Sequence, residues 1–213
     1  MVNMRNLSIC GFLCFLLFAA LSTLGQSTMN SGIIKTANGV LVVSNEPGNF
    51  YTMEIKGGSI KPVPDHPFWF EVDGKFFQIV TVLRNQFLRP PNDKTLDEKV
   101  ILSEHQLWES DYISDTLKTK LKIGSEFMKL ANGMTALAWN YDMPHVADKQ
   151  TALRQLYLSV VKGDRVLALN TVVEATDDEK SLKKLLVDTM ETLKASDKPL
   201  SLEKAREQIL KGK

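Results

Sequence analysis

From residue 39 onward, apolar and polar positions alternate in short runs separated by turn residues, a pattern typical of β-strands. Two runs flank the turn sequence NEPGN at 45–49. Two aromatic-rich runs, 68–72 and 75–83, flank Asp73 and Gly74. Asp-Gly between strands favours a two-residue type I′ turn, because both residues tolerate positive φ. The pattern predicts antiparallel hairpins in the first part of the chain.

Two more hairpins are predicted in the second half of the chain. Asn132-Gly133 separates two alternating stretches within 120–142, and Lys162-Gly163-Asp164 separates another pair within 152–175. Asn-Gly is a turn signal of the same kind as Asp-Gly. Tight turns between successive strands indicate an antiparallel sheet rather than a parallel one.

A central helix is predicted between the two groups of strands. Both Thr95 and Ser103 begin a capping-box pattern, with Glu or Gln three residues later. We favour Ser103, because a start at Thr95 places Asp97 on the face that carries Trp108. The stretch 99–102 would then be an extended lead-in, and the helix should end near Leu117.

A second helix is predicted over 177–194, after the acidic stretch TDDEK. Its apolar residues recur at the three-and-four spacing of one buried face: Leu182, Leu185, Leu186, Met190 and Leu193. Thr176 or Asp177 is the expected N-cap, and carboxylates in the first turn are favoured by the helix dipole. The acidic cluster is therefore interpreted as a helix start rather than as a site. Ser201 is expected to cap a final short helix.

These elements predict an α+β fold: an antiparallel sheet of about six to eight strands with the central and C-terminal helices packed on it. The expected organisation is a signal peptide (1–25), a flexible leader (26–38), a single sandwich domain (39–195) and a short helical tail (196–213). A chain of 213 residues that is 44% apolar and 24% charged is sufficient for one such core.

The N-terminal segment has the features of a secretory signal peptide. Arg5 precedes an uncharged apolar run over 7–24, and small residues follow before Gln26. We expect export to a periplasmic or extracellular location, with residues 7–24 as an uncleaved membrane anchor the alternative. Both cysteines, Cys10 and Cys14, lie in this segment, so the cleaved chain forms no disulfide.

Charge and motifs narrow the function classes. The formal charge of +1 falls to 0 when residues 1–25, which carry one cation and no anion, are removed. This balance gives no reason to expect a nucleic-acid partner, and any membrane contact would be through the uncleaved N-terminal segment. Phosphate-binding loops, dinucleotide fingerprints and the common hydrolase motifs are absent from the sequence. We expect no cofactor.

The first candidate functional face lies in the central helix. His105 and Glu109 are four residues apart and share a face with Trp108 and Tyr112. This set could bind a metal or perform acid–base chemistry if Asp142 or His145 supplied a further ligand. We favour the simpler interpretation that the aromatic rings pack on the sheet.

A second candidate is the binding loop in AWNYDMPHVAD. It carries Trp139, Tyr141, Asp142 and His145 near the end of a strand. Alternation predicts that Trp139 and Tyr141 are buried and that Asp142 is exposed. His66, between prolines in PVPDHPFWF, is interpreted as part of a structural connection. A small apolar ligand between helix and sheet is a further possibility that would require a sizeable pocket.

The stretch LYLSVVKGDRVLALNTVVEATDDEKSLKKLLVDTMETLK, a hairpin followed by a closing helix, resembles PsbP/DcrB-type α/β sandwiches. The resemblance covers residues 39–195 and carries no functional motif. It implies envelope or accessory proteins that bind other proteins, sometimes with metals, and it does not imply one activity. Together with the N-terminal segment, the neutral charge and the missing catalytic motifs, it favours an exported, non-enzymatic module that binds another protein or an envelope component. The competing hypothesis is a metal-binding protein or hydrolase that uses His105 and Glu109.

Overall fold

The computed structural model of the chain describes residues 31–66, 68–89, 96–144 and 151–211. These residues form strands, α-helices and one 3-10 turn at Arg84–Gln86. The strands are β1 (Gly32–Lys35), β2 (Gly39–Glu46), β3 (Asn49–Lys56), β4 (Ile60–Pro62), β5 (Trp69–Val72), β6 (Lys75–Leu83), β7 (Ile123–Lys129), β8 (Thr135–Asp142), β9 (Ala152–Lys162), β10 (Arg165–Glu174) and β11 (Lys194–Ser196). The helices are α2 (Glu98–Leu117), α3 (Glu179–Glu191) and α4 (Leu202–Lys211).

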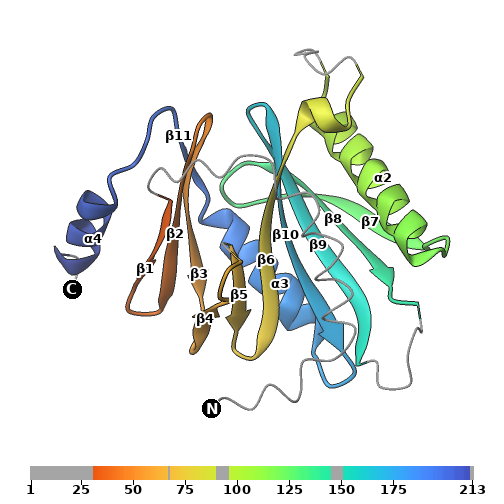
Figure 1. Cartoon of the computed structure of the whole chain (residues 1–213), viewed down its shortest axis with the longest axis horizontal. Coiled ribbons are helices and arrows are strands. Elements are labelled where there is room, and N and C mark those ends of the chain that lie inside the picture. The colour runs from red at the N-terminus through yellow and green to blue at the C-terminus, as the bar shows by residue number, and fades with distance from the viewer. Residues whose placement is uncertain (1–30, 67, 90–95, 145–150, 212–213) are drawn as a thin grey trace.

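The strands form two antiparallel sheets (Figure 1). The larger sheet has seven strands in the order β4-β5-β6-β10-β9-β8-β7, and the smaller has four in the order β1-β2-β3-β11. The α+β class and the antiparallel sheet with packed helices are confirmed. The predicted first hairpin, β2–β3, belongs to the smaller sheet, but a second sheet was not predicted. Its strand β11 could not be predicted from local sequence, because it forms by pairing Ala195 with Tyr51, far away in the chain.

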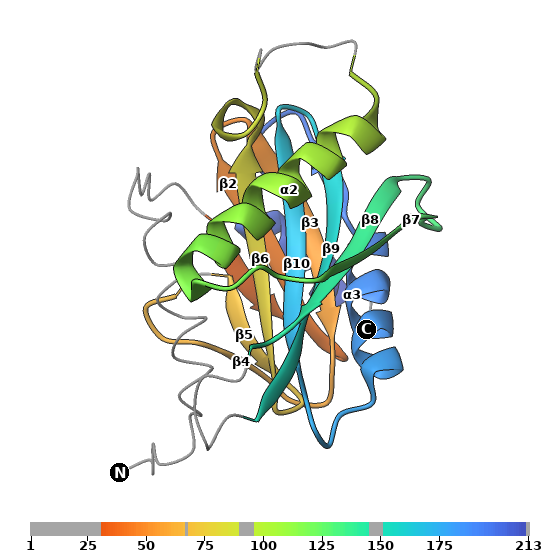
Figure 2. The ribbon, with the colours of Figure 1, turned by 90° about the vertical axis from the view of Figure 1, so that its right-hand side faces the viewer.

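Each face of the larger sheet is covered by different elements. The smaller sheet and α3 lie on one face, where α3 contacts β3, β9 and β10. Helix α2 crosses the other face and contacts β8 and β9 (Figure 2). Because side chains alternate along a strand, β8, β9 and β10 each contribute buried residues to two separate cores, one on either face of the sheet.

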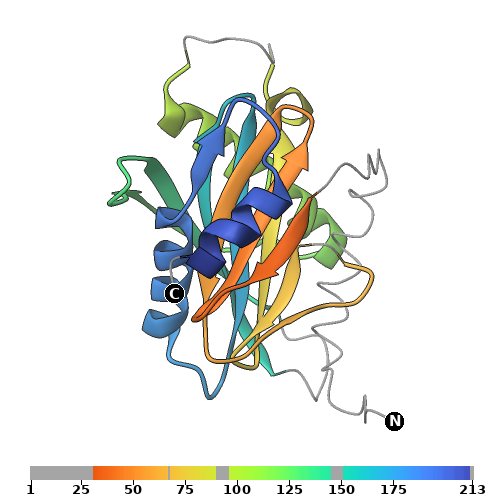
Figure 3. The same cartoon turned by 90° about the vertical axis from the view of Figure 1, so that its left-hand side faces the viewer.

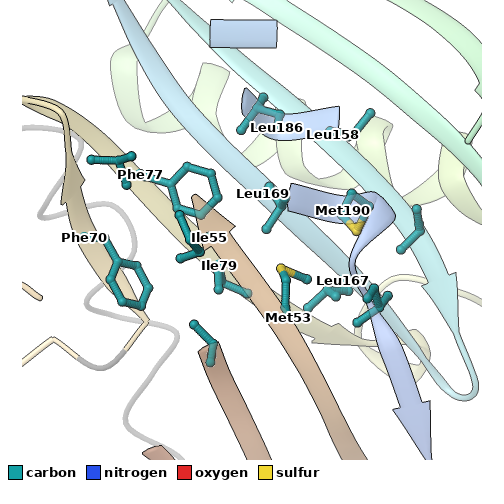
Figure 4. Packing of buried hydrophobic residues seen from close by; sticks show 14 of the residues in the cluster. Met53, Ile55, Phe70, Phe77, Ile79, Leu158, Leu167, Leu169, Leu186 and Met190 are labelled. Atoms are coloured by element: carbon teal, nitrogen blue, oxygen red, sulfur yellow. The ribbon is translucent and has the colours of Figure 1, made fainter. Parts of the chain in front are cut away.

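The main core lies between the two sheets and α3 (Figure 4). Its fully buried side chains come from both sheets and the helix, and include Met53, Ile55, Phe77, Leu169 and Met190. The second core lies between α2 and the larger sheet and is built around Leu102, Ile113, Trp139 and Tyr157. The predicted spacing of α3 is confirmed, with Leu182, Leu186 and Met190 buried.

The predicted hairpins are all present. Asp73 and Gly74 both have positive φ (50° and 81°), as a type I′ turn requires. The β7–β8 hairpin has a longer loop than the two-residue turn expected from Asn132-Gly133, since Lys129 pairs with Thr135 and Gly133 alone has positive φ there. Gly163 has positive φ in the β9–β10 turn, where Lys162 pairs with Arg165.

The prediction that α2 begins near Ser103 is wrong. The helix begins at Glu98, and the Asp97 side chain caps it by accepting a hydrogen bond from the Lys99 backbone N–H at 2.7 Å. The segment 99–102 is therefore helical rather than extended. The prediction assumed that the face carrying Trp108 is the buried one, whereas Trp108 is half-buried and Val100 is 45% exposed. The predicted end of the helix, at Leu117, is confirmed.

The two ends of the described chain make contacts that the sequence did not predict. Strand β1 lies within the segment that was expected to be a flexible leader, and it pairs with β2. Helix α4 lies on the smaller sheet, with the Leu202 side chain against Gly32 (Figure 3). Asn45 connects to the approach to α4 through hydrogen bonds with the N–H and C=O of Leu200 at 2.7 and 2.8 Å. The Ser201 cap is confirmed, because its hydroxyl accepts a hydrogen bond from the Lys204 N–H.

The predicted signal peptide, and with it Cys10 and Cys14, lies outside the described residues. Among the helices that the structure describes, none is long and apolar enough to cross a membrane.

Candidate functional site

Helix α2 places a mixed set of side chains against the larger sheet. Beside the apolar Ile101, Leu102 and Ile113, its buried residues include four polar ones: His105, Gln106, Glu109 and Ser110. Gln106 and Ser110 bond to each other at 3.3 Å, and Ser110 also bonds to the Leu107 carbonyl. A helix face of this composition is unusual for a core, because each buried polar group must find a partner or cost stability.

The structure brings His105 and Glu109 together, as their spacing predicts. His105 Nε2 and Glu109 Oε2 are 3.5 Å apart, and the two residues are 0% and 4% exposed. Burial lowers the pKa of His105 to about 4 and raises the pKa of Glu109 to about 8. Both groups are therefore uncharged near neutral pH, so the pair is a contact between neutral groups rather than a salt bridge.

The other two members of this face have different environments. Trp108 and Tyr112 are half-buried at the margin of α2. Trp108 lies 6.2 Å from His105 and 6.2 Å from Phe87, measured between ring centroids, and Phe87 meets His105 edge-on at 5.2 Å. This aromatic arrangement encloses the His105 ring and leaves it out of contact with solvent, which favours the packing interpretation of the face.

Trp139 and Tyr141 of β8 are buried, as alternation predicts, and belong to the core beneath α2. The Trp139 ring stacks on Tyr157 at 3.8 Å with an interplanar angle of 7°. The two sets of candidate residues, chosen from separate stretches of sequence, therefore contribute to one interface. Trp139 and Tyr141 are 1% and 2% exposed, which favours the interpretation that they pack in the core.

The two remaining residues of the predicted binding loop do not join this interface in the described structure. Asp142 is exposed and binds Arg154 at 2.6–2.7 Å, and Arg154 also bonds to Glu179 at 2.9 Å. His145 lies outside the described residues. Among the residues that are described, no three His, Cys, Asp or Glu side chains gather closely enough to hold a metal ion.

His66 has a packing partner that the sequence did not reveal. Its ring stacks on Trp69 at 4.4 Å, and Trp69 meets Phe76 edge-on at 5.6 Å. The neighbouring Asp65 has positive φ, which turns the chain before β5. The interpretation of this segment as a structural connection agrees with these contacts.

Each residue of the acidic stretch at the start of α3 has a structural role. Asp178, rather than the expected Thr176 or Asp177, is the N-cap and accepts a bond from the Lys180 N–H at 3.2 Å. Asp177 accepts from the Glu174 N–H and pairs with Lys75. Glu179 pairs with Lys183 and Arg154. The cap moves one residue because Asp177 is engaged at the end of β10.

Sequence reasoning missed a polar ladder inside the larger sheet. Asn170 donates to Gln78 at 3.1 Å and accepts from Gln155 at 3.0 Å, which connects β6, β10 and β9 through buried amide side chains. The signal was available in KFFQIVTVL and LALNTVV, where a single amide interrupts an apolar strand. Such a ladder fixes strand register, because a shift would leave buried amides unpaired.

Sequence reasoning also missed a cavity on the opposite face from α2. It has a volume of about 280 Å³ and lies between α3 and the three strands at one end of the larger sheet, β9, β8 and β7. Met128, Leu156 and Val187 are among its apolar lining residues, and Glu126 and Lys183 are its charged ones. Glu126 is exposed, so the cavity opens to solvent along β7. No periodicity marks it, since its lining residues come from four separate elements.

Strand β7 itself forms one edge of the larger sheet. It pairs with β8 only. The pairing runs from Ile123 opposite Tyr141 to Lys129 opposite Thr135, and no other described strand lies beyond β7. Four consecutive residues, 124–127, are exposed, and Phe127 is 41% exposed. The Lys99 ammonium of α2 lies 5.5 Å from the centre of the Phe127 ring. The strand therefore has one free backbone edge, a cavity on one side and a cation on the other.

Comparisons with known proteins give a similarity to solved structures. No protein-family model matches the sequence, and no curated protein matches it. Among solved structures, the chain is similar to the solution structure of cyanobacterial PsbP (CyanoP) from Synechocystis sp. PCC 6803. The identity is 14% and the TM-score is 0.49, over 80% of this chain and 100% of that chain. The PsbP-like resemblance given by the sequence agrees with this finding, at the level of the fold alone.

Proposed function

We propose that the protein is an exported, non-catalytic binding module that holds another protein by adding an extended segment of it to the edge strand β7. The observation that supports the proposal is the state of that edge: seven residues long, exposed over 124–127 and adjacent to an open cavity. Unpaired backbone N–H and C=O groups on such an edge are a template for a further strand.

The other sheet edges in the described part of the chain are poorer templates. Strand β4 has three residues and ends at Pro62, which has no N–H to donate. Strand β11 also has three residues. Strand β1 has four, and α4 packs beside it. Protected or short edges are how sheet proteins prevent unwanted pairing, so a long uncovered edge favours an interaction.

Burial argues against the alternative function, a hydrolase or metal protein centred on His105 and Glu109. A catalytic group must be within hydrogen-bond reach of its substrate. Both side chains lie on the buried face of α2 with essentially no exposed surface, and Asp142 is paired with Arg154. We therefore place the functional surface at β7 rather than under α2.

Photo-crosslinking in intact cells of the source organism tests the proposal. A benzophenone amino acid in place of Phe127, on β7, is expected to give a covalent product with a partner protein. The control carries the same group in place of Lys35, an exposed residue of β1 in the smaller sheet. Absence of a product at position 127, or equal products at both positions, contradicts binding at this edge.

The same product tests export. A cleaved signal peptide gives a chain that begins at Gln26, which N-terminal sequencing of the purified product would identify. A chain that retains residues 7–24 and fractionates with membranes would instead establish the anchored form.

A further inference from the structure

We infer that the segment received by β7 is acidic and apolar in alternation, with an apolar side chain in the cavity beside α3 and carboxylates facing α2. This inference rests on the proposed function, because it assigns the chemistry of the partner at the same edge. It follows from the different environments of the two faces of β7.

The face of β7 toward α3 selects apolar side chains. Gly124, Glu126 and Met128 lie on this face, since they pair with Asn140, Ala138 and Ala136 of β8, opposite to the residues beneath α2. A strand added beyond β7 would lie about 4.8 Å away, so its side chains on this face would reach the cavity mouth. The cavity floor there is formed by Met128, Ala138, Leu156, Leu158, Leu186 and Val187.

Glu126 restricts what can enter from this side. It is the acidic residue of β7 and it lines the cavity, where Lys183 is already paired with Glu179 at 3.0 Å. A carboxylate placed opposite Glu126 would meet a like charge directly across the strand pair, which is unfavourable. An apolar side chain avoids this repulsion and buries its surface against the cavity floor.

The face of β7 toward α2 selects carboxylates. Ser125, Phe127 and Lys129 lie on this face, and the Lys99 ammonium is held over the Phe127 ring. Lys99 and Lys129 are both exposed. Side chains of an added strand on this face would therefore lie beside two cations.

The segment that leads into β7, together with β7 itself, has the same sign of charge. Over residues 118–129 the chain exposes four lysines and one acidic residue: Lys118, Lys120, Lys122, Lys129 and Glu126. Complementary charge of this kind steers association and excludes partners of the wrong sign. A basic or neutral segment would lack these contacts.

The test uses two fluorescently labelled synthetic heptapeptides with the purified protein. One alternates aspartate with leucine, and the matched peptide has lysine in place of aspartate. Fluorescence anisotropy at low salt is expected to give binding of the aspartate peptide about ten-fold tighter than that of the lysine peptide. The preference should decline as salt is raised, because the charges involved are exposed.

Two sets of variants test the contribution of the lysines and that of the cavity separately. Lys99→Glu with Lys129→Glu should abolish or reverse the preference for aspartate, whereas Lys35→Glu with Lys56→Glu, on the smaller sheet, should leave it unchanged. Ala138→Phe fills the cavity and should weaken both peptides together. Ala138→Leu is the milder version, and thermal unfolding shows whether each variant is folded.

The outcomes separate this inference from the proposed function. Equal binding of both peptides, lost on filling the cavity, overturns the acidic chemistry and leaves strand addition standing. A preference for the aspartate peptide that survives the Lys99 and Lys129 reversal also overturns the inference. Binding of neither peptide overturns both the inference and the proposed function.

Discussion

At the scale of single residues, the His105–Glu109 pair is the most unusual feature of the chain. Sequence spacing correctly places the two side chains together, but it cannot say whether the shared face is open or covered. That depends on α2 packing over β8 and β9, a contact between distant parts of the chain. Because α2 covers both groups, their shifted pKa values affect the stability of the fold, and the groups do not contact a substrate.

The pair predicts a fall in stability above pH 6.5. The folded state keeps the Glu109 proton up to a pKa of about 8, against 4.5 when unfolded, so Glu109 makes stability fall with pH between 4.5 and 8. His105, whose pKa falls from 6.5 to about 4, has the opposite effect between 4 and 6.5. Only the Glu109 effect remains above 6.5, and it amounts to about 2 kcal/mol by pH 8.

Urea unfolding between pH 6.5 and 8 measures this effect. Glu109→Gln, which cannot ionise, should make the free energy of unfolding nearly constant over this range. Glu104→Gln, at an exposed position of the same helix, should keep the decline of the wild-type protein. Parallel curves for the two variants would exclude Glu109 as the cause.

At the scale of elements, most local signals gave correct predictions, and the strands that form through distant pairing were missed. The Asp73-Gly74 hairpin follows from turn chemistry alone, and α3 follows from its apolar spacing. Strand β11 exists because it pairs with β3, and β1 because it pairs with β2, so neither has a signal of its own. The start of α2 was misplaced because the cap is Asp97, which begins neither of the two capping-box patterns, and because the buried face of the helix is partly polar.

The start of α2 can be tested by removing its caps. Asp97→Ala deletes the acceptor of the Lys99 N–H bond and should lower the free energy of unfolding by about 1 kcal/mol. Ser103→Ala, inside the helix, should have a smaller effect. Asp115→Ala, near the C-terminal end where the dipole disfavours anions, should be neutral or slightly stabilising. A larger loss for Ser103→Ala than for Asp97→Ala would restore the later helix start.

At the scale of the whole molecule, the described residues form two sheets with helices on both faces of the larger one, and they leave one long sheet edge, β7, uncovered. The sequence predicted the class of fold and an accessory binding role, and it directed attention to His105 and Trp139. The structure moves the candidate surface to β7 because burial, edge exposure and the cavity arise only when α3 and β7–β9 are assembled. A lysine-bearing strand next to an apolar cavity is not visible as a motif, since its parts are far apart in sequence.

Amide hydrogen exchange of the protein with and without the aspartate–leucine peptide tests strand addition at β7 most directly. Alternate residues of an edge strand point their N–H groups away from the sheet, and a bound strand would engage them. We predict that alternate amides of residues 123–129 slow about ten-fold or more on binding, while the β4 edge at 60–62 is unchanged. Unchanged exchange throughout β7 in a saturated complex would contradict the account.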